Sequence, residues 1–395
     1  MYIKRREFLK MGSLVSASLM LPNFLKALET DNSLQNRPNI LVVLQFTGGN
    51  DGLNTIIPTR NDIYFRERSQ IGIKNSLRLN DEAGINPNLG FFKKLYEQGE
   101  LAVLNNVGYP NPDKSHFRSM DIWHSASRSD EYLETGWLGR YLDEACYDCP
   151  HPTQALEVDD MLSLALKGKN NKAFAFKEPR KLYQLSQENY LKTLAQQHDH
   201  EEETVSYLYS TLGSTINNAD YIFDKSKTKA TADTYPNSGL GKEFKTISSL
   251  IKSDINTRVY YLSIGSFDTH VNQNDRQGKL FQEINEAVKA FVADLKKHGL
   301  FKNVLLMTFS EFGRRVAQNA SNGTDHGTAN QLFFISGGLK KQGMLNALPD
   351  LRNLHEGDLI YTEDFRKVYA TVLKNWLQAD CNKILGWKNG LYDFV

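Results

Sequence analysis

The sequence has few cysteines, and their spacing limits what they can do. Only 3 of its 395 residues are Cys, which is too few for the disulfide framework of a small secreted domain. Cys146 and Cys149 form one Cys-x-x-Cys pair, whereas Cys381 stands alone. A structural zinc site would need a second such pair. We therefore favour incidental thiols or one local bridge over a redox motif, and a zinc site least of all.

An excess of charge and a long apolar run are also missing. The chain has 47 Lys and Arg against 46 Asp and Glu, a net charge of +1. Proteins that bind nucleic acid usually carry a basic face or stripe, so we expect no nucleic-acid partner. The uncharged stretch 11–25 is Ser-rich and shorter than the about 20 apolar residues that span a membrane. We expect no membrane span in the mature protein.

The first residues have the layout of an export signal. They read Met-Tyr-Ile-Lys-Arg-Arg-Glu-Phe-Leu-Lys, and the uncharged stretch follows. A basic start before a short apolar core is typical of export signals, and paired Arg residues are typical of the twin-arginine type. The alternative is an ordinary basic helix start. We predict a signal at residues 1–30, the twin-arginine translocase as a partner, and a periplasmic or cell-envelope location. The signal is either cleaved near Ala27 or kept as an anchor.

Short apolar runs alternate with helical patterns in the rest of the chain. Five runs hardly alternate between apolar and polar residues, as is typical of buried parallel strands: 40–46, 101–107, 259–264, 304–309 and 332–335. Three segments repeat apolar residues at helical spacing: 89–98, 277–298 and 365–377. This alternation predicts an α/β fold with a doubly wound, mostly parallel sheet flanked by helices. We expect a single domain over residues 38–390.

Residues 150–240 interrupt the alternation. They are polar and loop-rich, with a low-complexity tract at 225–233, and we expect a helical and loop-rich insertion or cap on the sheet. The run 198–203 reads His-Asp-His-Glu-Glu-Glu. Such a run can bind a metal, but a solvated charged segment is the more common outcome.

Polar side chains follow the predicted strands at the point where each strand ends. In open α/β sheets, ligands bind outside the carboxyl ends of the strands, so we expect these side chains to converge. Carboxylates and imidazoles suit one or two divalent ions such as Zn²⁺, Mn²⁺, Mg²⁺ or Ca²⁺, and a Ser at a helix start near a metal can be a nucleophile. The residues concerned are Asp51, Ser115, Asp268, His270, Glu311, Asp325 and His326.

Each of these residues also has a structural alternative. Asp51, after Gly-Gly-Asn, can be a turn residue, and Ser115 can cap its helix. Glu311 can pair with Arg314 across a helical turn. The prediction depends on four such clusters, each tied to a strand end.

The clusters resemble the conserved blocks of a known family. They read Leu-Gln-Phe-Thr-Gly-Gly-Asn-Asp-Gly-Leu-Asn-Thr (44–55), Ser-His-Phe-Arg-Ser-Met-Asp-Ile-Trp (115–123), Phe-Asp-Thr-His (267–270), Ser-Glu-Phe-Gly-Arg-Arg (310–315), Gly-Thr-Asp-His-Gly-Thr-Ala (323–329) and Asp-Phe-Arg-Lys-Val-Tyr (364–369). In this order they resemble the domain of unknown function 1501 family, over about residues 38–390. That family is similar to the alkaline-phosphatase and sulfatase superfamily and often begins with a twin-arginine signal.

The resemblance implies an alkaline-phosphatase-like fold and roles for the matching residues. Asp51 matches a metal-binding Asp after the first strand, and Ser115 matches the residue that attacks phosphorus or sulfur. Asp268 and His270 resemble an Asp–His metal pair, although they are two residues apart instead of four. His326 corresponds to a last metal-binding His.

The sequence departs from the superfamily at two places. Glu311 and Phe312 stand where the superfamily has Asp and His, which favours one metal or an altered pair. The sulfatase signature Cys/Ser-x-Pro-x-Arg is absent, since the stretch at 115–118 reads Ser-His-Phe-Arg. An ordinary sulfatase mechanism is therefore not expected.

Together, these features predict an exported, metal-dependent hydrolase or transferase of phosphate or sulfate esters. Asp51, Asp268, His270, Glu311 and His326 would bind metal, with Asp325 as a further ligand, and the anionic ester would be attacked by Ser115. His116, Arg118 or Arg314 would hold the anionic oxygens. The alternative is a non-catalytic, phosphatase-like binding or assembly protein of the cell envelope, because a fold does not fix a function.

Overall fold

The computed structural model describes residues 37–145, 153–170, 173–189, 218–227 and 234–395, and the single positions 193, 213 and 216. The predicted signal at 1–30, the Cys146–Cys149 pair and the run 198–203 lie outside these residues, as does much of the predicted insertion. The chain divides into two units, Met1–Pro38 and Asn39–Val395. All described helices and strands lie in the second unit.

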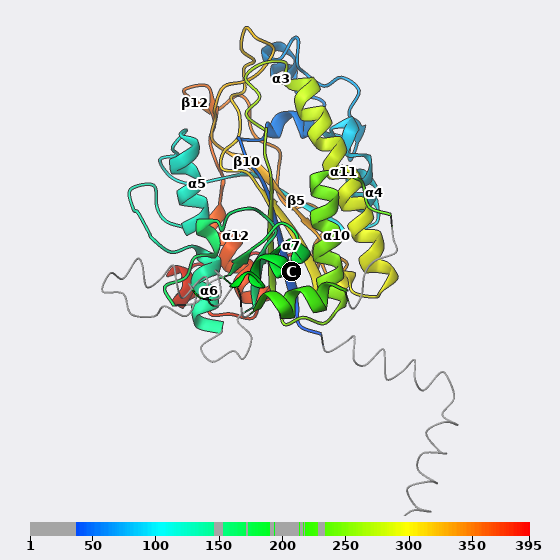
Figure 1. Ribbon diagram of the computed structural model, residues 1–395. Coiled ribbons are helices and arrows are strands. Elements are labelled where there is room, and N and C mark those ends of the chain that lie inside the picture. Colours follow the sequence, from blue (N-terminus) through cyan, green and yellow to red (C-terminus); the bar gives the residue numbers. More distant parts are fainter. Residues whose placement is uncertain are drawn as a thin grey trace, which may run out of the picture. The chain divides into compact units, whose positions relative to one another are not determined.

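A nine-stranded sheet forms the centre of this unit (Figure 1). The strand order is β11–β5–β10–β9–β1–β8–β6–β7, and β14 also pairs with β5. The strands are β1 (Ile40–Phe46), β5 (Leu101–Gly108), β6 (Ala155–Glu157), β7 (Phe174–Ala175), β8 (Val259–Ile264), β9 (Val304–Phe309), β10 (Asn330–Ile335), β11 (Gly343–Met344) and β14 (Glu363–Asp364). Strand β10 is antiparallel to β5 and β9, and the other pairings are parallel. The prediction of a mostly parallel sheet is confirmed.

Burial on both faces explains why these sequences form strands. Every residue of β9 is buried, and six of the seven residues of β1 are buried. Such strands are rich in Val, Leu, Ile and Phe because both rows of side chains need apolar neighbours. The predicted limits of β1, β8 and β9 match the observed ones, and β10 begins two residues earlier than predicted.

Helices cover both faces of the sheet (Figure 1). One side carries α4 (Gly90–Glu97), α10 (Gly239–Lys252) and α11 (Gln273–Lys297), and the other carries α5 (His116–Ser125), α6 (Trp137–Ala145), α12 (Phe365–Thr371) and α13 (Cys381–Leu385). Trp123 of α5 stacks on Phe309 of β9, with ring centroids 5.3 Å apart. On the opposite side, Phe291 of α11 packs against Phe244 of α10 at 4.8 Å. This arrangement confirms the doubly wound α/β architecture.

Smaller elements complete the fold. A three-stranded sheet contains β2 (Ile56–Pro58), β3 (Leu77–Arg78) and β4 (Ala83–Ile85), and a two-stranded ladder contains β12 (Leu354–His355) and β13 (Asp358–Leu359). Further α-helices are α3 (Asp62–Glu67) and α7 (Pro179–Ser186); the short helical turns include η1 (Gly52–Asn54), η2 (Pro87–Leu89), η3 (Leu164–Leu166), η4 (Phe301–Asn303) and the π-helical η5 (Val372–Trp376). The predicted helix 365–377 is therefore α12 continued by η5.

The described part of the predicted insertion adds to the sheet. Strands β6 and β7 fall within residues 150–240, and they extend the central sheet beyond β8. Strands β6 and β7 of this part therefore widen the sheet.

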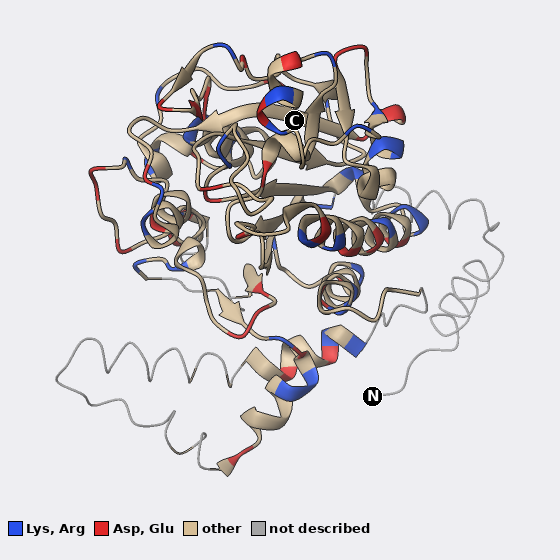
Figure 2. Cartoon of the chain, turned by 90° about the horizontal axis from the view of Figure 1, so that it is seen from above, with Lys and Arg blue, Asp and Glu red and all other residues tan. Residues whose placement is uncertain are grey.

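Charge and hydropathy of the described residues bear on the predicted partners. Figure 2 shows Lys and Arg interspersed with Asp and Glu along the described ribbon rather than gathered on one side. Among the described residues, no helix is both long and apolar enough to cross a membrane.

Candidate metal centre

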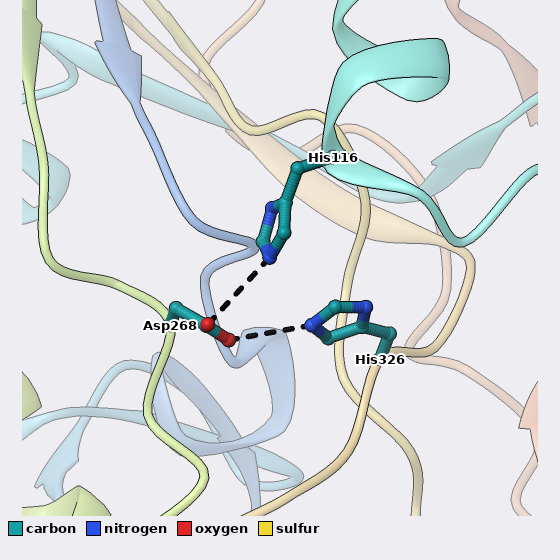
Figure 3. A group of neighbouring side chains, drawn as sticks. All are labelled: His116, Asp268 and His326. Carbon is teal, nitrogen blue, oxygen red and sulfur yellow. Dashed lines mark hydrogen bonds and ion pairs between the residues drawn. The ribbon is translucent and has the colours of Figure 1, made fainter.

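Three of the predicted site residues converge at one edge of the sheet (Figure 3). His116 begins α5, Asp268 follows β8, and His326 lies in the loop that leads to β10. One ligand atom of each lies within 4.8 Å of the others. Nε2 of His326 is 3.3 Å from Oδ1 of Asp268, and Nε2 of His116 is 3.7 Å from Oδ2. Ligands at about 2.1 Å from a tetrahedral zinc ion lie roughly 3.4 Å apart, so these separations fit one shared ion.

His270 brings a further ring to the same place. Its Nε2 lies 3.0 Å from Oδ1 of Asp268 and 3.1 Å from Nε2 of His326. The four residues His116, Asp268, His270 and His326 are named the His3Asp cluster below. Imidazole nitrogens and a carboxylate are donor types that suit zinc and other borderline metals, and the group whose ligand atoms all lie within 4.8 Å of one another contains His116, Asp268 and His326.

The opposite nitrogen of each ring in the His3Asp cluster has its own acceptor. A proton on Nδ1 that is donated to an acceptor leaves the lone pair of Nε2 free to bind a metal. The acceptors are Glu311 Oε1 for His116 (2.9 Å), Asp325 Oδ1 for His270 (3.1 Å) and the Lys114 carbonyl oxygen for His326 (2.7 Å). We therefore assign the proton to Nδ1 in all three rings.

The atoms that face the centre of the cluster are hydrogen-bond acceptors, which repel one another and would be stabilised by a cation. With Nδ1 protonated, the Nε2 atoms of His270 and His326 and the Asp268 carboxylate are acceptors only, and they lie 3.0–3.3 Å apart. Nε2 of His116 is buried and has no hydrogen-bond partner among the described residues. A buried acceptor without a partner is costly. A metal ion bound by these atoms would remove both the repulsion and the missing contact.

The surroundings of the cluster shift the pKa values of its members. Burial raises the pKa of Asp268, but the hydrogen bond and charge of Arg314 outweigh burial, and the net pKa is lowered. Burial lowers the pKa of His326. Near neutral pH these shifts favour the ionised carboxylate and the neutral imidazole, which are the metal-binding forms. The hydrogen bond to Glu311 raises the pKa of His116, so a proton competes with metal at that ring.

Glu311 lies behind His116 rather than beside the other ligand atoms. Its side chain is fully buried, and Oε1 accepts from the Gly48 N–H at 2.7 Å as well as from His116. Glu311 therefore orients His116, whereas we predicted that Glu311 would bind the metal. His116, which we predicted to hold anionic oxygens, lies in the cluster itself. Asp325 likewise contacts Nδ1 of His270 at the outer side of that ring.

Arg314 forms a buried hub beneath the His3Asp cluster. Its guanidinium donates to carbonyl oxygens from three chain segments and to Oδ1 of Asp268 at 2.8 Å. The carbonyl oxygens are those of Gly48, Gly49, Phe267 and Thr324. The residue is 2% exposed, so its N–H groups serve the fold and the carboxylate of Asp268 rather than an incoming anion.

A glycine turn after β1 makes room for this hub. Gly48 and Gly49 have φ angles of +117° and +76°, a region that residues with a side chain rarely adopt. A Cβ at Gly49 would overlap the ring of Phe312. That ring packs against His116 and His326 at centroid distances of 4.9 and 4.7 Å. Phe312 therefore packs against two rings of the cluster, at the position where the alkaline-phosphatase-like superfamily has a His.

Asp51 lies apart from the cluster. Its carboxylate forms a fully buried ion pair with Arg68, with Nη1 and Oδ2 2.5 Å apart, and accepts from Gln273 Nε2 at 2.5 Å. The backbone N–H of Leu53 donates to the other oxygen at 3.2 Å. A metal ion at Asp51 would have to displace these contacts. Arg68 and Gln273 carry no signal in the sequence, because neither belongs to a motif or directly follows a strand.

The remaining predicted residues lie on the first turn of α5. Ser115 is exposed at the N-cap position, and its side chain makes no capping hydrogen bond. Its hydroxyl is therefore open to solvent directly before His116. Arg118 turns toward the loop after the helix, where it donates to the carbonyl oxygen of Ser129 at 2.9 Å and lies over the ring of Tyr132 at 3.7 Å. The structure does not bring Arg118 into the cluster.

The fold and the cluster thus define a class: a doubly wound α/β protein with a histidine-rich candidate metal centre at the carboxyl edge of its sheet. The chain belongs to the family described as "Protein of unknown function (DUF1501)", whose sequence model matches residues 38–374. This match confirms the resemblance seen in the motifs. No curated protein matches the chain.

Three solved structures illustrate what the chain is similar to. The first is a lipoteichoic acid synthase from Listeria monocytogenes, with 11% identity, 89% of this chain and 73% of that chain covered, and a TM-score of 0.35. A sulfatase from Pseudoalteromonas sp. has 12% identity, coverage of 89% and 70%, and a TM-score of 0.39. A phosphonate monoester hydrolase from Silicibacter pomeroyi has 7% identity, coverage of 90% and 78%, and a TM-score of 0.41. Similarity at this level does not transfer an activity.

Proposed function

We propose that this protein is a metal-dependent hydrolase or transferase of phosphate or sulfate esters. The observation that carries the proposal is the His3Asp cluster, in which three rings direct Nε2 toward Asp268 while an acceptor holds each Nδ1. Acceptors of this kind behind metal-binding His rings fix their orientation.

The donor set favours one Zn²⁺ ion among the divalent metals. Imidazole nitrogens suit zinc and other transition metals, whereas Mg²⁺ and Ca²⁺ prefer oxygen ligands, and Mn²⁺ also favours them. His116, Asp268, His270 and His326 would hold the ion. When bound, it would supply Lewis-acid stabilisation of the negative charge that develops on the ester oxygens.

Ser115 is the proposed nucleophile. Its hydroxyl is exposed and makes no capping contact, and it stands at the N-terminus of the ten-residue helix α5, where backbone N–H groups favour an anion. Its Oγ would form the new bond to phosphorus or sulfur as the bond to the alcohol oxygen breaks, and the Ser proton would end on the departing alcohol. Water, or a second alcohol, would then take the group from Ser115.

A non-catalytic binding protein is the second candidate. It is supported by Asp51, which is neutralised by Arg68 instead of standing free for a second ion, and by Phe312, which packs on two rings of the cluster. This candidate predicts stable folding without metal and no turnover of any ester.

We also propose that the protein acts outside the cytoplasm. The support is the paired Arg5 and Arg6 before Phe-Leu-Lys and a short uncharged stretch, which are typical of passengers of the twin-arginine translocase. Replacing both Arg residues with Lys should retain the protein inside the cell, as measured by fractionation of a bacterial host.

The deciding experiment measures metal and turnover in the same preparations. The wild type should hold about one divalent ion per chain by mass spectrometry, and an Asp268→Ala/His270→Ala variant should hold none. Asp350→Asn is the matched control, because this exposed carboxylate pairs only with Arg352 among the described residues. Ser115→Ala should keep the metal and lose turnover of 4-nitrophenyl phosphate or 4-nitrophenyl sulfate.

The outcomes separate the candidates. Metal without turnover in the wild type would favour the binding protein. Turnover that survives in Ser115→Ala would remove Ser115 from the mechanism. A wild type without metal, even after incubation with Zn²⁺, Mn²⁺, Mg²⁺ and Ca²⁺, would overturn the metal-dependent hydrolase and favour the binding protein.

A further inference from the structure

A fully buried amide lies between the Arg68–Asp51 ion pair and the segments that carry the His3Asp cluster. Gln273 is the first residue of α11, and its side chain has no contact with solvent. Its Nε2 donates to Oδ2 of Asp51 at 2.5 Å, the same oxygen that pairs with Arg68. Its Oε1 accepts from the hydroxyl groups of Thr269 at 3.2 Å and Thr324 at 2.5 Å. One side chain therefore joins the ion pair to two buried hydroxyl groups.

The two threonines belong to the segments that carry three residues of the cluster. Thr269 lies between Asp268 and His270, and Thr324 is two positions before His326. Both threonines are buried, and the N–H of Thr324 donates to the carbonyl oxygen of Thr269 at 3.3 Å. The shared amide acceptor therefore holds the segment after β8 and the loop before β10 at one point, directly beside the candidate ligands.

Asp51 determines which way this amide points. A carboxylate only accepts hydrogen bonds, so the NH2 group of Gln273 has to face Asp51, and the amide oxygen has to face the threonines. Reversing the amide would place its oxygen 2.5 Å from a carboxylate oxygen. Because Arg68 supplies the counter-ion of Asp51, the ion pair fixes the amide, and the amide fixes the two ligand segments.

We propose that Gln273 is a positioning residue of the metal centre, and that the Arg68–Asp51 pair acts on the ligands through it. Asp51 then contributes to metal binding without touching the ion. Groups that hold metal ligands in place raise the affinity for the metal, because less of the binding free energy is spent on ordering the site. The inference rests on the proposed function, since it needs a metal ion at the His3Asp cluster, but it does not need turnover of an ester.

The test measures Zn²⁺ affinity of the full chain by competition with a chelator. Gln273→Met removes the amide at similar length and should weaken Zn²⁺ binding about tenfold. Gln277→Met is the matched control, one helical turn further along α11. Gln277 is also buried, but it donates to Asn50 Oδ1 at 3.0 Å and to the Asp51 carbonyl oxygen at 3.1 Å, in the turn after β1. The control should lose stability in urea and keep the Zn²⁺ affinity of the wild type.

Milder variants of Thr324 test the same contact if Gln273→Met does not fold. Thr324→Val removes the hydroxyl and keeps the shape, and it should weaken Zn²⁺ binding roughly 2- to 10-fold, the range for one hydrogen bond. Thr324→Ser keeps the hydroxyl and should keep the affinity. The double variant Gln273→Met/Thr324→Val should bind no more weakly than Gln273→Met, because both changes remove one shared contact. The visible absorption of bound Co²⁺, which reports ligand geometry, should change in Gln273→Met and not in Gln277→Met.

Failure of this proposal is distinguishable from failure of the proposed function. Unchanged Zn²⁺ affinity in Gln273→Met, an equal loss in Gln277→Met, or equal affinities of Thr324→Val and Thr324→Ser would overturn the positioning role while the metal centre stands. The expected losses in a protein that hydrolyses no ester would support the positioning role although the hydrolase fails. A wild type that binds no Zn²⁺ would overturn both.

Discussion

Replacing Arg68 with Met should lower the free energy of unfolding by about 3–5 kcal/mol, the usual cost of removing one partner of a buried ion pair. Arg68 and Asp51 both have fully buried side chains, with the charged atoms 2.5 Å apart. The guanidinium also donates to Asn54 Oδ1 and to the carbonyl oxygens of Arg315 and Val316, each at 2.8 Å. One side chain thus joins four points in the chain.

The magnitude follows from what remains when Arg68 is lost. Among the described residues, the Asp51 carboxylate then keeps only Gln273 and the N–H of Leu53 as partners, so a buried charge loses its counter-ion. The two backbone carbonyls lose donors at about 1 kcal/mol each. The double variant Arg68→Met/Asp51→Leu removes both charges and should recover most of the ion-pair loss. The stability of Arg68→Lys should lie between that of the wild type and that of Arg68→Met. A Lys keeps the positive charge, but its ammonium lacks the planar fork of a guanidinium.

The assay is urea unfolding followed by tryptophan fluorescence, since Trp123 and Trp137 are buried in the core. Metal content is measured on the same samples. A midpoint of Arg68→Met equal to that of the wild type, or a double variant no more stable than the single one, would refute the reasoning. Loss of metal in Asp51→Asn without loss of stability would instead support the ligand role that the family resemblance implies.

Three further outcomes test other parts of the structure. Glu311→Gln should weaken metal binding 10- to 100-fold, because it weakens the acceptor that orients His116; competition with a chelator of known affinity measures this, and an unchanged affinity would contradict it. Burial raises the pKa of Glu157 to about 8 from 4.5, so the folded state keeps a proton that the unfolded state releases, and stability falls as pH rises from about 4.5 to 8. Glu157→Gln should flatten that dependence and be more stable than the wild type at pH 8, by up to about 4 kcal/mol. Urea unfolding of both proteins at pH 5 and pH 8 measures this, and the same difference in stability at both pH values would contradict the prediction. Gly49→Ala should lower the melting temperature and cost about 1–3 kcal/mol, since its φ is +76° and a Cβ would overlap Phe312; an unchanged melting temperature would show that the turn can rearrange.

Much of the sheet could be predicted because its signal is local. Strands β1, β8 and β9 are continuous apolar runs between polar turns. A run of six or seven such residues is too short for a typical buried helix and therefore indicates a buried strand. The short strands β6 and β7 could not be predicted, because two or three residues carry no periodicity. They join the sheet only through pairing with β8 and with each other.

The candidate site was predictable in outline and not in detail. Strand ends indicated where polar residues gather, but the direction of each side chain depends on local geometry. His116 and Arg118 are two positions apart on α5 and so point in different directions around the helix, and only His116 enters the cluster. Arg68 could not be found, because its carbonyl partners lie 247 and 248 residues away along the chain.

Arg314 would affect the selectivity of the candidate site for different metal ions. One guanidinium ties the turn after β1, the segment after β8 and the loop before β10 together, so the backbone around the ligand atoms is set when the chain folds. Bringing the ligands together is then a cost of folding rather than of binding, as in any preorganised site. A frame held in this way cannot expand or contract freely, so a metal site built on it would discriminate between ions by their radius as well as by their chemistry.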